Sequence, residues 1–248
     1  MLKERYIEFK ANKFREEHGL ATAEPVDLHK LLAKLNVITF FDELSPNFSG
    51  MAVKCSSEKF MLINSSDIRA RQHFTIGHEL YHLYIQEDFK NSICQEVGTF
   101  NRKNKEEYNA DWFSSYLLMP EGGIWELLPQ EEVGLNKISI NTIVKMEQYF
   151  GVSRTALLNR LMFIGLINKN RKDEFKALGN IKRSALLMGY GDELYDIGNS
   201  YMVIGAYGEK AKRLYDKNLI SETDFYGLMF DIGIDLDKIV KEDGKTAG

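Results

Sequence analysis

Apolar residues recur every three or four positions over most of this chain, and they form short β-prone runs in only one region. The helical spacing covers residues 2–18, 27–35, 71–85, 105–120, 138–149 and 153–164. The β-prone runs cover residues 37–41, 50–54 and 60–64, with Asp, Ser, Pro, Asn and Gly between them. This order predicts an α+β fold in which a small, mostly antiparallel sheet packs on helices.

Residue types that favour helix ends support several of these boundaries. Gly19 follows the first helix, and Asp27 is placed to cap the second. Residues 65–67 (Ser-Ser-Asp) offer capping groups to the helix that follows the third β-prone run. Gly122–Gly123 is expected to break the chain before a short helix at 124–128.

The chain changes in character after residue 167. Residues 168–178 form a charge run that is either a linker or a solvated helix. The remaining residues, including 201–204, are patterned as a small helical module in which residues 221–224 (Ser-Glu-Thr-Asp) begin a helix. Residues 244–248 are expected to fray.

The candidate chemistry lies on the helix at 71–85, in the sequence His78-Glu79-x-x-His82. Four residues on a helix span about 400° of rotation, so both imidazoles share a face and can hold one metal ion. The Glu79 carboxylate leans toward the same edge, where it can act as a base toward a water molecule. The alternative is a solvated face, but the apolar flanks indicate a core helix, where these polar groups are costly unless something satisfies them.

A hydrolytic zinc site usually takes three protein ligands and keeps one position open, so the chain needs a third ligand. Glu107 and Asp111 are at i and i+4 on the helix at 105–120 and therefore share a face. We predict that Glu107 binds the metal and that Asp111 accepts a hydrogen bond from the outer ring nitrogen of a ligand histidine. Glu106 points about 100° away, so a one-residue error in helical phase would exchange the two glutamates.

Several short motifs surround these residues. They are Ile63-Asn64, Arg71-Gln72-x-Phe74-Thr75, His78-Glu79-Leu80-x-His82, Glu107-x-x-Ala110-Asp111-x-Phe113, Leu117-Leu118-Met119-Pro120 and Phe150-Gly151-Val152-Ser153 with the helix after it. In this combination the chain resembles the ImmA/IrrE family of metallopeptidases. The resemblance implies a gluzincin-like zinc site, with two histidines from one helix and a glutamate from the next. Gly77 and His73 stand where the family usually has other residues.

The resemblance extends over roughly residues 10–167 by motif placement. It implies a zincin-like metallopeptidase domain at residues 1–130 and a helix-turn-helix-like region at 131–167. A small helical C-terminal module is expected at residues 168–248.

Composition limits the classes of function. A net charge of −4 gives no support to a chain that mainly binds phosphate backbones, although it leaves room for a local basic patch. The two cysteines are unpatterned, which favours a reducing cytoplasm over a secreted disulfide scaffold. No apolar stretch approaches about twenty residues, and the N-terminus lacks a leader pattern, so we expect a soluble, cytoplasmic protein without membrane contact.

The leading hypothesis is a zinc endopeptidase in which His78, His82 and Glu107 hold Zn²⁺ and Glu79 is the general base. The resemblance implies that the substrate is a helix-turn-helix repressor of a mobile element or phage-like locus. Spacing does not choose the donor to the tetrahedral oxyanion among four neighbouring side chains. They are His73, Tyr81, Tyr108 and Tyr116.

The competing hypothesis is a regulator that binds DNA or a partner protein through the helices at 138–164 and uses zinc only structurally. Its second helix carries only Arg154 and Arg160 as cations, which favours a supporting role over DNA binding. Glu79 discriminates between the hypotheses, because a structural site has no use for a general base. A third hypothesis, the companion of a toxin, has no residue-level support.

Overall fold

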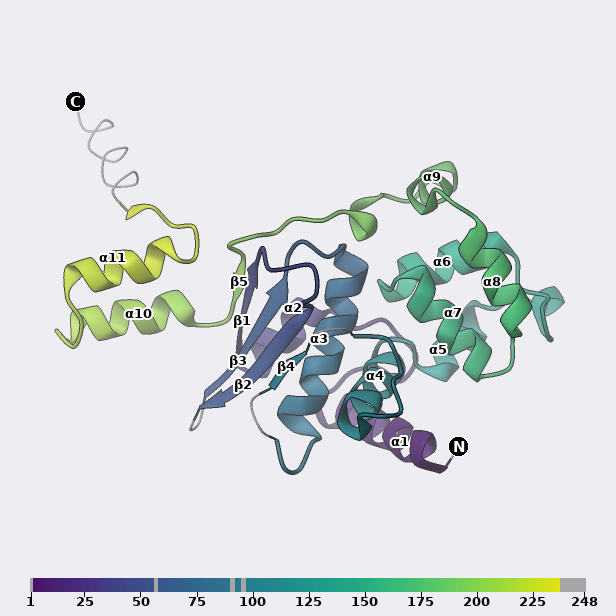
Figure 1. The fold of residues 1–248 in the computed structure, drawn as a ribbon, viewed down its shortest axis with the longest axis horizontal. Helices are drawn as coiled ribbons and strands as arrows, with labels where there is room; N and C mark the ends of the chain where they lie inside the picture. The colour runs from purple at the N-terminus through teal and green to yellow at the C-terminus, as the bar shows by residue number, and fades with distance from the viewer. Residues whose placement is uncertain (1, 56–57, 90–91, 95–96, 237–248) are drawn as a thin grey trace.

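The computed structural model describes residues 2–55, 58–89, 92–94 and 97–236 (Figure 1). Its elements in chain order are α1 (Leu2–Glu17), α2 (Leu28–Lys34), β1 (Val37–Asp42), β2 (Gly50–Cys55), β3 (Glu58–Asn64), α3 (Arg69–Tyr84), β4 (Ser92–Cys94), α4 (Lys105–Leu118), α5 (Glu121–Leu127), α6 (Ile140–Phe150), α7 (Arg154–Phe163), α8 (Lys169–Ala177), α9 (Ile181–Leu187), β5 (Val203–Ile204), α10 (Tyr207–Asp216) and α11 (Glu222–Phe230). The predicted α+β class is confirmed.

The strands form one sheet in the order β4-β2-β3-β1-β5. β1 and β3 are parallel, with Val37 opposite Lys59, and the other three pairs are antiparallel. The expectation of a small, mostly antiparallel sheet is therefore confirmed, and the three expected strands are β1, β2 and β3. Helix α3 packs against β2 and β3, which places the His78 motif directly beside the sheet.

The strand β5 corrects the expectation that residues 201–204 are part of a helical module. Val203 pairs with Phe40 and Ile204 pairs with Thr39, so this segment extends the sheet beyond β1. An edge strand leaves unpaired backbone groups, and even a two-residue strand satisfies some of them. A run this short has no alternating pattern from which it could be predicted.

The helix α3 begins without the side-chain cap that residues 65–67 were expected to provide. Its N-cap is Ile68, which makes no side-chain capping bond. Asp67 instead lies 3.2 Å from Arg71 Nε, and its carbonyl accepts a hydrogen bond of 2.8 Å from the Gln72 side chain. By contrast, the predicted cap of α2 is present, because Asp27 accepts from Lys30 N.

Helices α3 and α4 pack closely because one position between them has no side chain. A Cβ at Gly77 would lie 2.5 Å from Ser114 Oγ and 3.1 Å from Ser114 Cβ. The Ser114 hydroxyl donates to the Phe74 carbonyl at 2.7 Å, which ties the two helices together. This approach brings the acidic face of α4 against the histidines of α3.

Packing overturns one expectation about the helices and decides between the two alternatives for another. Gly122 and Gly123 lie inside α5 and do not break the chain. A Cβ at Gly123 would lie 2.0 Å from the Ala23 carbonyl oxygen, so this glycine permits close packing of α5. Residues 168–178 mostly form helix α8, whose Phe175 is buried, so the helix alternative is correct and the linker alternative is wrong.

Helices α6 and α7 form the predicted helix pair, joined by Gly151 with a φ of +64°. Arg154 is buried and its Nε lies 2.6 Å from Glu147 Oε1. Arg160 is also buried, donating to the Met119 carbonyl at 3.2 Å and lying 3.3 Å from Glu8. Neither guanidinium group is exposed to solvent, where it could contact a phosphate.

The elements after α7 lie on two sides of the sheet and its helices. Figure 1 shows α8 and α9 beside α6 and α7, whereas α10 and α11 lie on the opposite side.

Helix α11 begins at the predicted residues, with a capping box between Ser221 and Asp224. The expectation of fraying at 244–248 lies outside the described residues. No helix in the described ranges has the length and apolarity needed to cross a membrane.

Candidate metal centre

Helices α3 and α4 bring the three predicted metal ligands together. The ligand atoms of His78, His82 and Glu107 all lie within 4.8 Å of one another. His78 Nε2 is 3.2 Å from His82 Nε2 and 3.0 Å from Glu107 Oε2. His82 Nε2 is 3.5 Å from Glu107 Oε1, which completes a triangle of nitrogen and oxygen atoms.

The outer nitrogen of His78 faces Asp111, as the helical spacing of α4 anticipated. His78 Nδ1 lies 2.9 Å from Asp111 Oδ1, and because a carboxylate only accepts, Nδ1 is the donor. The backbone N–H groups of Gly98 and Phe100 also donate to Asp111, each at 2.7 Å. Asp111 is thus held from three directions, and it fixes the ring of His78 with Nε2 toward Glu107.

The outer nitrogen of His82 has a partner that the sequence interpretation missed. His82 Nδ1 lies 2.6 Å from Gln86 Oε1, so the ring donates to an amide oxygen. Gln86 is four residues after His82 and just beyond the end of α3, so the i, i+4 spacing was the available clue. His78 and His82 therefore differ in the charge of their outer partners.

The arrangement of hydrogens leaves the centre of the triangle electron-rich. Both imidazoles donate through Nδ1, so a neutral ring of either residue presents a lone pair at Nε2. Burial lowers the pKa of His82, and the nearby His78 lowers it further, which favours the neutral ring. Two lone pairs and a carboxylate that meet at these distances repel one another unless a cation lies between them. The residues therefore fit a metal ion.

Glu79 lies next to this triangle without belonging to it. Its side chain is buried, and its Oε1 atom has no hydrogen-bond partner in the described part of the protein. Burial raises the pKa of Glu79 to about 7; His78 lowers it and Glu107 raises it. A buried carboxylate with one unsatisfied oxygen beside a cation site is suited to accept a proton from water.

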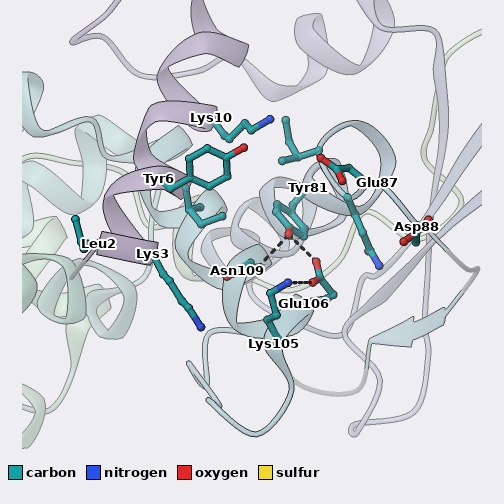
Figure 2. A pocket seen from close by; sticks show the side chains of 13 residues that line it. Leu2, Lys3, Tyr6, Lys10, Tyr81, Glu87, Asp88, Lys105, Glu106 and Asn109 are labelled. Atoms are coloured by element: carbon teal, nitrogen blue, oxygen red, sulfur yellow. Dashed lines mark hydrogen bonds and ion pairs between the residues drawn. The ribbon is translucent and has the colours of Figure 1, made fainter.

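Glu106 points away from the histidines, as the predicted helical phase requires. Its Oε2 atom accepts a 2.7 Å hydrogen bond from the Tyr81 hydroxyl, which in turn accepts from Asn109 at 3.3 Å (Figure 2). These residues line a cavity of about 600 Å³ between α1 and the facing ends of α3 and α4. Gln86 also lines this cavity, so the cavity adjoins the candidate metal centre through the partner of His82.

The four side chains considered as oxyanion donors are directed elsewhere. Tyr81 donates to Glu106, Tyr108 donates to Glu4 at 2.8 Å, and His73 Nδ1 lies 2.8 Å from the Gly151 carbonyl. Tyr116 is buried with its ring 4.5 Å from the Arg160 guanidinium. The Tyr81 ring packs edge-on against the His82 ring, with centroids 5.5 Å apart, but its hydroxyl is bound to Glu106 and Asn109.

Comparison with known proteins agrees with this geometry. The model of a peptidase family, described as the IrrE N-terminal-like domain, matches residues 33–162, which is just over half of the chain and includes His78, His82 and Glu107. A search of curated proteins found no match. The chain therefore belongs to the peptidase family defined by the IrrE N-terminal-like domain.

Proposed function

We propose that the protein is a zinc-dependent endopeptidase whose metal ligands are His78, His82 and Glu107. The observation that carries this proposal is the size of the ligand triangle. Its three edges measure 3.0, 3.2 and 3.5 Å. Zinc bonds of about 2.0–2.1 Å in a tetrahedral arrangement separate neighbouring ligand atoms by about 3.3 Å.

The composition of the ligand set supports zinc and a hydrolytic role. Two imidazoles and one carboxylate form a set used by zinc peptidases, and three protein ligands leave a position open. When bound, zinc lowers the pKa of a water molecule and polarises a carbonyl group. Asp111 and Gln86 hold the two rings in the tautomer that this role requires.

Glu79 is the proposed general base. Its carboxylate accepts the proton of the attacking water and then delivers it to the nitrogen of the leaving amine. Its burial and its unsatisfied oxygen support this role. A buried carboxylate oxygen without a hydrogen-bond partner lowers the stability of the fold, and a catalytic role explains why such a group is kept. Its pKa, raised to about 7 mainly by burial, suits a group that both accepts and returns a proton.

The proposed substrate is a helix-turn-helix repressor of a mobile element or phage-like locus, cleaved in the cytoplasm. The motif resemblance described above supports this choice. The reaction is hydrolysis of an internal peptide bond, with water as the second reactant.

The alternative, a regulator with a structural zinc ion, is less well supported. It assigned DNA binding to α6 and α7 through Arg154 and Arg160, yet both side chains are buried in internal contacts. A closed structural site also fills its fourth position with Cys or His. The cluster among the described residues has only the three ligands.

The test is the substitution Glu79→Gln. Glutamine keeps the shape and spares the three ligands but does not accept the proton, so cleavage should fall by about 10²- to 10⁴-fold. Purified helix-turn-helix repressors serve as substrates, beginning with any encoded beside this gene, and cleavage is followed by mass spectrometry. Glu106→Gln makes the same change at a carboxylate that faces Tyr81 and not the metal ligands, so it is the matched control and should cleave like the parent.

Zinc content is measured on the same samples. Equal zinc in the parent and Glu79→Gln, together with a large loss of cleavage, supports the proposed mechanism. Cleavage by Glu79→Gln at the parental rate would overturn it.

A further inference from the structure

One stretch of the chain has many more basic than acidic residues. Residues 137–183 contain ten Lys/Arg and three Asp/Glu, a net charge of +7, whereas the whole chain carries −4. This stretch contains α6, α7, α8 and the start of α9, and Figure 1 shows these helices grouped on the side away from α10 and α11. Arg154 and Arg160 are buried, but the other eight cations are exposed or half-buried, so the acidity of the whole chain conceals a basic surface region.

Three lysines of this region form a stripe on α8. Lys169, Lys172 and Lys176 are at i, i+3 and i+7, so they share one helical face. Lys172 Nζ lies 2.5 Å from Asn159 Oδ1, which places the stripe beside α7. Burial lowers the pKa of Lys172, Lys176 and Lys169 lower it further and Asp173 raises it, so both outer ammonium groups are close enough to repel that of Lys172. A bound polyanion would relieve this repulsion.

Helix α7 presents a narrow uncharged edge next to this stripe. Thr155 and Met162 are exposed and Asn159 is half-buried, and the three residues are at i, i+4 and i+7. Most of the rest of the helix is buried, including both of its arginines. We call this surface the α7–α8 face; it consists of Thr155, Asn159, Met162, Lys169, Lys172 and Lys176.

We propose that the α7–α8 face binds duplex DNA. The major groove of B-DNA is about 12 Å wide and admits an α-helix, while cations beside that helix reach the phosphates. The edge of α7 supplies side chains suited to base edges, because a Thr or Met side chain contacts a thymine methyl group and an Asn amide pairs with adenine. The Asn159 amide becomes available when Lys172 leaves its Oδ1 atom for a phosphate.

Two other polyanions fit this face less well. An A-form RNA duplex has a deep, narrow major groove that side chains do not enter. An acidic protein segment would account for the lysine stripe but leaves no role for the adjoining polar edge of α7. The helix pair, the uncharged edge and the lysines together favour DNA, and the acidic segment becomes an outcome of the test.

The test measures binding of a fluorescent 30-base-pair duplex to the full-length protein at several salt concentrations. The parent should bind with Kd of about 10⁻⁴–10⁻⁶ M near physiological salt, and more tightly as salt falls. Replacing Lys169, Lys172 and Lys176 by Ala should weaken binding by roughly tenfold or more and reduce the salt slope by up to about three, since each lost phosphate contact removes about 0.9.

A second triple variant controls for net charge. Lys212, Arg213 and Lys217 are exposed on or next to α10, on the far side of the molecule, and their replacement by Ala removes the same charge. This control and Glu79→Gln should both bind DNA like the parent, so the result is independent of the peptidase proposal. Circular dichroism checks that each variant is folded.

Three results would overturn the proposal. The first is parental affinity in the α8 triple variant, and the second is no DNA binding by the parent at low salt. The third is capture of a polyglutamate peptide by the α7–α8 face with no binding of DNA, which would identify the partner as an acidic protein segment.

Discussion

At the scale of single residues, the two histidines of the candidate metal centre are oriented by unlike groups. His78 donates to the Asp111 carboxylate, which two backbone N–H groups also hold, whereas His82 donates to the Gln86 amide. A carboxylate raises the basicity of an imidazole more than an amide does. We therefore expect the Gln86 contact to act mainly by fixing the ring of His82.

The prediction at this scale concerns Gln86. Gln86→Leu removes the acceptor, so His82 is free to rotate, and zinc affinity should fall by about 10- to 100-fold. Gln86→Glu keeps an acceptor oxygen and should restore most of the affinity. Glu87→Leu places the same apolar side chain on the wall of the same cavity and should bind zinc like the parent. Competition with a chelator measures affinity, and an unchanged value for Gln86→Leu would exclude this role.

The residues that approach the candidate site were predictable to different degrees. Helical spacing alone placed Glu107 and Asp111 on the side of α4 that faces the histidines and turned Glu106 away. The N–H groups of Gly98 and Phe100 that hold Asp111 were not predictable, since every non-proline residue has such a donor. Which loop approaches a carboxylate depends on the tertiary fold.

At the scale of elements, periodicity identified the long helices and the three central strands, but packing decided the remaining cases. Gly122–Gly123 was expected to break the chain, yet a close approach between α5 and the Ala23 backbone explains Gly123. The short strand β5 depends on a long-range pairing with β1 that local sequence does not encode.

The prediction at this scale compares two neighbouring glycines of α5. Gly123→Ala would place a Cβ 2.0 Å from the Ala23 carbonyl oxygen, so it should lower the free energy of unfolding by about 1–3 kcal/mol. Gly122→Ala meets only Ala23 Cβ at 3.9 Å and should be neutral or stabilising by up to about 1 kcal/mol. Urea unfolding of both variants provides the comparison, and equal stabilities would contradict this account of α5.

At the scale of the whole molecule, the elements from α1 to α8 share one hydrophobic core, and a second, smaller cluster contains Ala185 and Tyr195. A single cluster of buried apolar residues extends from Ile7 in α1 to Phe175 in α8 and includes α3, α4, α6 and α7. The candidate metal centre lies between two helices of this core, so a bound ion would join α3 to α4. Charge is also distributed unevenly over the molecule. The net charge of −4 for the whole chain does not reveal the excess of cations on the side formed by α6 to α9.

The most direct test of the central claim is the zinc content of the purified protein, measured by mass spectrometry with folding checked by circular dichroism. We expect about one zinc ion per chain in the parent and in Glu106→Gln, and a strong loss in His82→Ala and Glu107→Gln. Glu107→Gln retaining its zinc while Glu106→Gln loses it, or full zinc in every variant, would contradict the assignment of His78, His82 and Glu107 as the metal ligands.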